Sequence, residues 1–337
     1  MTPTFHPRLV NGRFGDPALF VEMLHRREAL LFDMGDLSAL STRDLLRVSR
    51  VFVSHMHMDH FIGFDALLRV HVGREKTIRI TGPEGLCERV HHKLHGYEWD
   101  LAEKYDADLV IEASEIRADG KHHAACFRFK RRFAWEPPPQ RSGSDLDGFE
   151  VRAALLEHHG PCVGYALSEP AHANVWKVRL QERGLETGPW LQELKRLVLA
   201  GAGDDTPVAL PDGPTASLGE VRELVTISPG QKVAYVTDVA DTPANRAGIA
   251  QLASGADLFF LESRFAAADG EQARERAHLT TTAAGEIARA AGVRRLEPFH
   301  FSPRYDGEED RMISEVMSAF EGAPAQTPAL KDAGAEP

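Results

Sequence analysis

One segment limits what the rest of this chain can be. Residues 51–68, VFVSHMHMDHFIGFDALL, begin as an apolar strand, pass through a histidine-rich turn and continue as a helix. His55 and His57 are two residues apart, so in extended chain their side chains point the same way and can hold one ion. Asp59 and His60 lie past the turn and can face a second ion. A surface histidine tract is the alternative, but the carboxylate and the apolar anchors on both sides favour a metal site.

A site for two ions needs more ligands than this segment supplies. Three candidates stand at the ends of strand-like runs: His158 follows VRAALLE, Asp238 follows KVAYVT and His300 follows RLEPF. Each alone is weak, because a histidine or aspartate at a strand end more often caps a turn. Together they supply the missing ligands, so the sequence predicts a dinuclear metal site.

The remainder of the chain alternates short β-branched or apolar runs with helical patterns, which indicates a layered α/β protein. Strands are predicted at residues 28–35, 50–55, 77–83, 149–158, 232–238, 256–263 and 295–301. Helices are predicted at residues 64–72, 174–184 and 281–292. Periodicity and spacing do not give the order of the strands in a sheet.

Charge and composition exclude several classes of protein. The formal net charge of −11 argues against a protein that coats nucleic acid non-specifically. The densest basic run, FRFKRRF at 127–133, predicts a strand with cations on one face, for which a solvated face is favoured over a phosphate-binding patch. In HHKLHGYEW, Tyr97 and Trp99 are expected in a core, with stacking on a base as the alternative.

The chain lacks an uninterrupted apolar run long enough to cross a bilayer, so no membrane span is expected. The opening residues lack the apolar stretch of a secretory signal, which makes the cytoplasm the expected location. Three cysteines far apart in the sequence suggest reduced structural thiols. We expect one domain over residues 1–322 and a disordered Ala/Pro-rich tail over residues 323–337.

Several motifs resemble the ribonuclease Z branch of the metallo-β-lactamase superfamily. HMHMDH resembles its signature loop, LEHHGPCVGYAL its third motif, and VAYVTD the segment that ends in a bridging aspartate. ADLFFLESRF, RAHLTTTAA and EPFHFSPRY resemble the later segments, in the family's order. The resemblance implies a four-layer αββα sandwich with a dinuclear metal site at one edge.

The resemblance also implies which residues bind metal. One ion would take His55, His57 and His158, the other Asp59, His60 and His300, with Asp238 as the bridge. Zinc is the expected ion, and manganese or iron also suit these ligands. A hydroxide bridging the ions would attack a phosphodiester.

Four further roles follow for this site. Asp59 would orient the nucleophile, and His278 would stabilise charge or protonate the leaving oxygen, unless it merely neighbours a helix cap. Glu262 is expected to orient a metal-binding histidine. Asp33 could do the same or simply end its strand.

The features that would recognise a substrate are less complete. GLETGP, within residues 168–205, resembles the arm by which ribonuclease Z binds transfer RNA. An amphipathic helix and turn packed on the same domain, with Trp176 and Trp190 in its core, is an equally expected alternative. Ala166 stands where the family usually has arginine, and residues 96–140 have no counterpart in it. Relatives of ribonuclease Z are expected to dimerise.

The leading hypothesis is therefore a zinc phosphodiesterase that processes the 3′ end of pre-tRNA. Hydrolysis of small phosphodiesters such as cyclic nucleotides by the same metals is the alternative, because a fold alone does not fix the substrate. Hydrolysis of a lactone or thioester is disfavoured by the His278 segment and the HFSPRY ending. An RNA-binding module with a vestigial site is disfavoured because all the ligands are present.

Overall fold

The structure, a computed structural model, describes residues 3–139, 148–211 and 213–322, which form two compact units. The first unit draws on Met1–Gly143, Val151–Leu167 and Lys232–Pro337, and the second on Ser144–Glu150 and Ser168–Gln231. The expected substrate-binding arm, residues 168–205, falls in the second unit. The expected tail, residues 323–337, lies outside the described residues.

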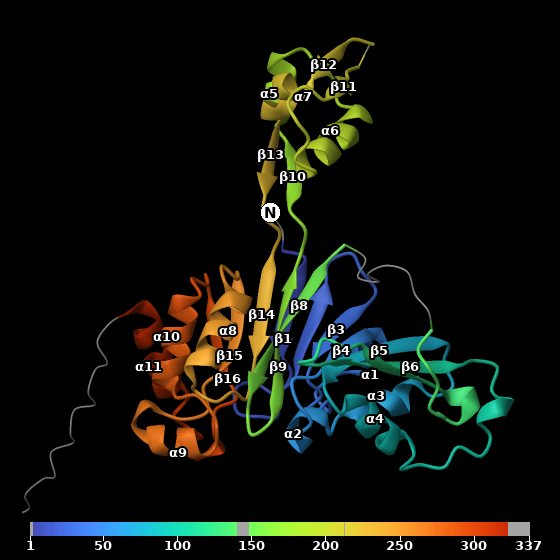
Figure 1. Cartoon of the computed structure of the whole chain (residues 1–337), viewed down its shortest axis with the longest axis vertical. Helices are drawn as coiled ribbons and strands as arrows, with labels where there is room; N and C mark the ends of the chain where they lie inside the picture. The colour runs from blue at the N-terminus through green and yellow to red at the C-terminus, as the bar shows by residue number, and fades with distance from the viewer. Residues whose placement is uncertain (1–2, 140–147, 212, 323–337) are drawn as a thin grey trace, which may run out of the picture. The chain divides into compact units, whose positions relative to one another are not determined.

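A seven-stranded sheet in the first unit carries the histidine-rich segment, with its strands in sequence order from β1 to β7 (Figure 1). Strands β3 to β6 are parallel to one another, and the pairs β1–β2, β2–β3 and β6–β7 are antiparallel. All of β3 is buried, as its apolar sequence ALLF requires in a strand covered on both faces. The strands are β1 Phe5–Leu9, β2 Leu19–Met23, β3 Ala29–Phe32, β4 Val48–Phe52, β5 Lys76–Pro83, β6 Leu109–Ile116 and β7 His123–Arg128.

A five-stranded sheet completes the centre of this unit, in the order β16-β15-β14-β9-β8. Strands β14, β15 and β16 are parallel, so their carboxyl ends meet at one edge. The strands are β8 Glu150–Glu157, β9 Pro161–Ser168, β14 Lys232–Val236, β15 Leu258–Glu262 and β16 Leu296–Phe299. Asp238 and His300 follow two of these strands and Glu262 ends the third, so the edge gathers polar side chains.

The two sheets pack face to face through aromatic residues. The Phe32 and Tyr235 rings have centroids 5.6 Å apart, and the Tyr165 hydroxyl donates to the Val53 carbonyl at 2.7 Å. Helices α1, α3 and α4 cover the outer face of one sheet, and α8, α10 and α11 the outer face of the other (Figure 1). The expected αββα layers are thus confirmed.

Each covering helix buries the side chains that recur at helical spacing. Helix α3 buries Phe64, Leu67, Leu68 and His71, at positions i, i+3, i+4 and i+7. The helices of this unit are α1 Thr42–Arg47, α2 Met58–Phe61, α3 Phe64–His71, α4 Leu86–Leu94, α8 Pro243–Ala253, α9 Gly270–Glu275, α10 Thr281–Ala290 and α11 Glu309–Glu321. Among the described residues, no helix combines the length and apolar character needed to cross a membrane.

The second unit has a small core of its own, built around Leu180, Leu194 and Leu218. Its elements are β10 His172–Val175, α5 Lys177–Glu182, α6 Trp190–Leu199, β11 Pro207–Ala209, β12 Thr215–Ser217, α7 Leu218–Val221 and β13 Val225–Ser228. Trp190 packs against this core, whereas Trp176 is half exposed beneath the Arg179 guanidinium, 4.9 Å from its ring. The two tryptophans therefore differ in environment.

The predicted strands all occur, but two predictions were wrong in part. The helix predicted at 174–184 spans only Lys177–Glu182, because the chain before it pairs as β10. The basic run at 127–133 leaves its strand at Arg128 and forms a 3₁₀ turn. Phe129 and Phe133 are both buried against Trp99, and this turn aims both rings inward.

Candidate metal centre

The histidine-rich segment forms the turn between β4 and α2, at the edge where the two sheets meet. The Val53 amide donates to the Thr81 carbonyl at 2.7 Å, and Phe61 is buried after the turn, so both ends are fixed. His55 and His60 are buried, Asp59 is half-buried and His57 is exposed. The turn therefore presents its side chains from a rigid frame.

Three residues of the site have left-handed backbone just after their strands. The φ angles are 56° for Asp33, 47° for Asp238 and 60° for His300. Such backbone costs roughly 1–3 kcal/mol per residue and is found mainly at functional sites. In each case it turns the chain sharply at the strand end, where neighbouring structure holds it: the Asp33 amide, for example, donates to the Phe52 carbonyl at 2.8 Å.

The residues predicted to bind metal lie together in the structure as two neighbouring sets. Atoms able to bind metal lie within 4.8 Å of one another in the first set, which is His55, His57, His158 and Asp238. The same limit holds for the second set, which is Asp59, His60 and His300. Asp238 stands between the sets: its Oδ2 is 3.6 Å from His55 Nε2 and 3.4 Å from His60 Nε2.

The outward ring nitrogens of His158 and His60 already have partners in the protein. His158 Nδ1 donates to the Ala277 carbonyl at 2.8 Å, and His60 Nδ1 lies 3.0 Å from the Asp33 carboxylate. Because a carbonyl and a carboxylate only accept, the neutral form of each ring carries its proton on Nδ1 and has its Nε2 lone pair facing the centre. Metal-binding histidines in proteins are held in this way.

The inward nitrogens have no partner of their own. The Nε2 atoms of His55 and His60 are buried and form no hydrogen bond. Buried polar atoms are nearly always paired, so two orphans facing a shared carboxylate need an explanation. A pair of divalent cations between the two sets would satisfy them, and the residues therefore fit two metal ions.

The protonation of the first set also suits a metal. Burial lowers the pKa of His55 to about 2, and repulsion from His60 acts in the same direction. Burial likewise lowers the pKa of His158. Both rings are neutral at physiological pH, which is the form that binds a metal ion.

The second set is more strongly polarised. Burial alone would lower the pKa of His60, but the charges of Asp238 and Asp33 outweigh it and raise that pKa well above its usual value. Burial opposes ionisation of Asp238, yet His300 and His60 hold its pKa well below the ordinary range. The centre therefore gathers negative charge that only cations or protons can balance.

Asp33 supports the histidine turn from behind. Its carboxylate is fully buried and accepts from the Ser54 amide at 2.6 Å, the Ser54 hydroxyl at 2.8 Å and the Tyr235 hydroxyl at 2.7 Å. With His60 Nδ1 it has four polar neighbours. Asp33 therefore does more than end its strand: it links the turn, His60 and the second sheet.

The histidine that Glu262 contacts is His278, which is not one of the predicted metal ligands. His278 Nδ1 lies 3.1 Å and 3.2 Å from the two Glu262 carboxylate oxygens, which are fully buried. The Val239 amide, next to Asp238, also donates to Glu262 at 2.8 Å. The His278 ring centroid is 4.7 Å from that of His158, so this histidine lies against the candidate metal ligands.

Arg264 also belongs to the site, although it was not among the residues predicted from the sequence. Its Nη1 lies 2.6 Å from His300 Nε2. Arg264 comes two residues after Glu262, at the end of β15, within the quoted run ADLFFLESRF. A cation just after a strand that ends in a predicted site residue was the available signal.

Comparison with known proteins places this geometry in a family. A ribonuclease Z of Deinococcus radiodurans is 32% identical over 305 residues, which cover 87% of this chain and 88% of that protein. The chain belongs to the ribonuclease Z family. It is thus an enzyme, a metal-dependent hydrolase, although no protein-family model matches it.

Solved structures agree on the fold of this ribonuclease Z family member. The metallo-β-lactamase fold protein YhfI of Bacillus subtilis aligns with a TM-score of 0.53 at 16% identity, covering 94% of this chain and 92% of its own. The short form of human tRNase Z aligns with a TM-score of 0.50 at 18% identity, covering 90% and 93%. These similarities show the metallo-β-lactamase fold; the metal ligands stay a prediction supported by geometry.

Proposed function

We propose that the chain is a zinc-dependent endoribonuclease that processes the 3′ end of pre-tRNA. The observation that carries the proposal is the convergence of two histidine-carboxylate sets on Asp238, in a chain whose relatives are ribonucleases Z. His55, His57 and His158 would hold one ion and Asp59, His60 and His300 the other, with Asp238 between them. Nitrogen and carboxylate ligands of this kind suit zinc.

Two cations held by these residues would supply the positive charge that makes a water molecule nucleophilic at neutral pH and that stabilises the phosphate oxygens. The residues of the chain would do the rest. The half-buried Asp59 would orient the attacking oxygen, which forms a bond to phosphorus while the bond to the leaving ribose oxygen breaks. His278, fixed by Glu262, would give a proton to that leaving oxygen.

Two finer points belong to the same proposal. We expect the enzyme to act as a homodimer, which light scattering on the purified protein tests. Residues 168–205 would contact the body of the transfer RNA, with Trp176 and Arg179 as an exposed stacking pair. Replacing both Trp176 and Arg179 by alanine should weaken cleavage of pre-tRNA and leave hydrolysis of a small phosphodiester unchanged.

The deciding experiment is cleavage of a 3′-extended pre-tRNA by metal-replete enzyme, beside a panel of cyclic nucleotides and bis(p-nitrophenyl) phosphate. We expect His278→Ala to lower kcat by about 10²- to 10⁴-fold, the usual contribution of a general acid. The control is His122→Ala, which removes an exposed histidine. Turnover of only the small diesters would instead assign the chain to the alternative class.

A further inference from the structure

A groove lies beside the candidate metal centre, between the histidine turn and helix α4. Its volume is about 690 Å³, within the range of small-ligand sites. His57, a predicted metal ligand, is part of its wall. Whatever occupies the groove therefore lies next to the reacting bond.

One wall of the groove is basic. Arg89, His92 and Lys93 line it, from one face of α4. They recur at i, i+3 and i+4, while the core face of the same helix carries Leu86, Cys87, Val90 and Leu94. Helix α4 thus presents two cations, Arg89 and Lys93, to the groove in a protein whose formal net charge is −11.

Lys93 and Arg89 differ in whether a carboxylate neutralises them. Lys93 Nζ pairs with Asp65 Oδ2 at 2.6 Å. Within the described part of the chain no carboxylate pairs with Arg89, whose guanidinium donates only to the Gly85 carbonyl at 3.3 Å. Arg89 is exposed and therefore free to bind an anion.

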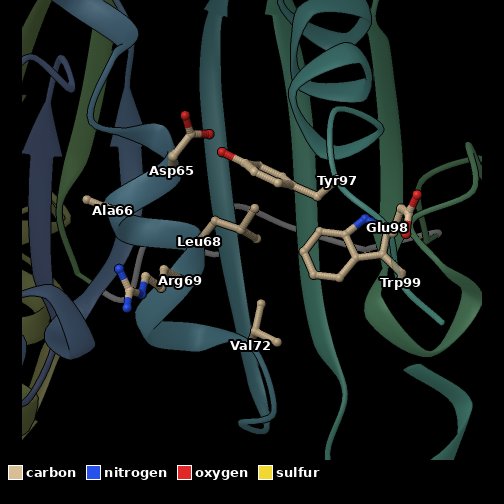
Figure 2. A pocket seen from close by; sticks show the side chains of 8 residues that line it. All are labelled: Asp65, Ala66, Leu68, Arg69, Val72, Tyr97, Glu98 and Trp99. Atoms are coloured by element: carbon tan, nitrogen blue, oxygen red, sulfur yellow. The ribbon is translucent and has the colours of Figure 1, made fainter. Parts of the chain in front are cut away.

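The other wall is apolar and unusually exposed. Met58 is 76% exposed, Ile62 47% and Tyr97 48%, and all three line the groove. A second cavity of about 640 Å³ shares Tyr97 and Asp65 with it and is lined further by Leu68 and Trp99. Figure 2 shows this second cavity between α3 and the chain that follows α4, with the Tyr97 hydroxyl directed toward Asp65.

Tyr97 and Trp99, the two aromatic residues that follow α4, have different surroundings. The Trp99 indole donates to the Leu94 carbonyl at 2.8 Å and packs against Phe129 and Phe133, so it belongs to the core. The Tyr97 ring meets the Trp99 ring edge-on, with centroids 6.1 Å apart, and is half exposed where the two cavities join. Of the two rings, Tyr97 is the one available for stacking.

We propose that this groove binds single-stranded nucleotides of the RNA substrate next to the scissile phosphate. A base would stack on Tyr97 against Met58 and Ile62, while Arg89 would contact a backbone phosphate. An aromatic platform beside a cationic wall is how proteins hold single-stranded RNA without reading its sequence. The inference rests on the proposed function, because the groove opens onto the proposed metal centre through His57.

The test separates binding from catalysis. Fluorescence anisotropy would measure the affinity of the full chain for a short labelled single-stranded oligoribonucleotide, with a chelator present so that nothing is cut. We expect Tyr97→Ala to raise Kd by about 5- to 150-fold, as loss of one stacked base does. Tyr97→Phe keeps the ring and should restore wild-type affinity. Arg89→Ala should lower the slope of log affinity against log salt by about 0.7, the value for one phosphate of a single strand.

Two matched controls exist in the same unit. Tyr105 is 46% exposed outside the groove, so Tyr105→Ala removes a comparable ring. Arg74 is exposed and donates to the Val70 carbonyl four residues earlier, as Arg89 does to Gly85, so Arg74→Ala removes a comparable cation. Neither change should alter Kd or the salt slope, and thermal melting would confirm that each variant is folded.

Unchanged RNA affinity in folded Tyr97→Ala and Arg89→Ala proteins would overturn the proposal. Loss of self-association in Tyr97→Ala, with RNA affinity intact, would also overturn it and assign the surface to a second copy of the chain. If pre-tRNA is not cut but these variants still lose RNA binding, the groove proposal stands and the proposed function fails. With active enzyme, Tyr97→Ala should raise KM for pre-tRNA more than it lowers kcat.

Discussion

Replacing Asp33 by asparagine would change one buried atom behind the candidate metal centre. Asparagine tolerates left-handed backbone, so the φ of 56° can be kept. Its amide oxygen can still accept from the Ser54 amide. Its NH₂ group then stands where the carboxylate oxygen faced His60 Nδ1 at 3.0 Å.

An amide nitrogen cannot accept the His60 proton. His60 Nδ1 must then act as acceptor, and the ring carries its proton on Nε2, which faces Asp238 at 3.4 Å. A metal ion would have to displace that proton. Loss of such a supporting partner lowers metal affinity by about 10- to 100-fold, or about 1.4–2.7 kcal/mol.

The metal-free fold should lose less than a full buried ion pair would imply. The new NH₂ group has two hydrogens for three neighbours: one faces His60, and only one of the Tyr235 and Ser54 hydroxyls can rotate to accept the other. One buried hydroxyl therefore loses its partner, and we expect Asp33→Asn to lower the free energy of unfolding by roughly 1–3 kcal/mol. Competition with a chromophoric chelator measures metal affinity, and urea denaturation of metal-free protein measures stability. The control is Asp119→Asn, at an exposed carboxylate. Wild-type affinity for both ions in Asp33→Asn would refute the reasoning and return Asp33 to the role of a strand terminator.

Three further outcomes are expected. Glu262→Gln should lower kcat by about 10- to 100-fold with little change in KM, because His278 loses the carboxylate that orients it; an equal rise in KM would contradict this role. Burial raises the pKa of Cys87 to about 12, so the thiol should resist alkylation at pH 8 until urea unfolds the protein. Because the thiol of the unfolded chain ionises first, the free energy of unfolding should fall as the pH rises from 9 to 12. Rapid alkylation of the native protein would contradict this reasoning. Gly285→Ala would place Cβ 2.4 Å from the Val316 carbonyl, between α10 and α11, and should destabilise the protein by roughly 1–3 kcal/mol in thermal melts; an unchanged melting temperature would show that these helices can move apart.

The sequence predicted the parts of this protein whose signals are local. The turn at His55–His60 and the ligands at strand ends could be found because strand, turn and histidine spacing lie within a few residues of one another. The four layers came from resemblance rather than periodicity. Glu262 was expected to orient a metal-binding histidine, whereas the ring it contacts is that of His278, because the loop after α9 returns there.

Other features depend on contacts between distant segments, which a single sequence does not display. Arg264 meets His300 across 36 positions, and Tyr235 meets Asp33 across 202. The basic run ending at Phe133 was predicted as a strand because aromatic and basic residues alternate in it. In the structure it forms a turn instead, which buries the rings of Phe129 and Phe133 in the core. The groove beside α4 could not be predicted either, because its walls come from the histidine turn and from α4, whose relative positions the sequence does not give.

The left-handed backbone at Asp33, Asp238 and His300 is local strain that the protein carries at its proposed metal centre. Glycine at any of these positions would relieve that strain and remove a side chain of the proposed centre in the same step. At Asp33 the exchange would also break the buried hydrogen bonds to Ser54 and Tyr235, so it would lower stability as well as metal affinity. A more stable variant should therefore keep these three residues and carry its substitutions on exposed helix faces, where side chains contact mainly solvent.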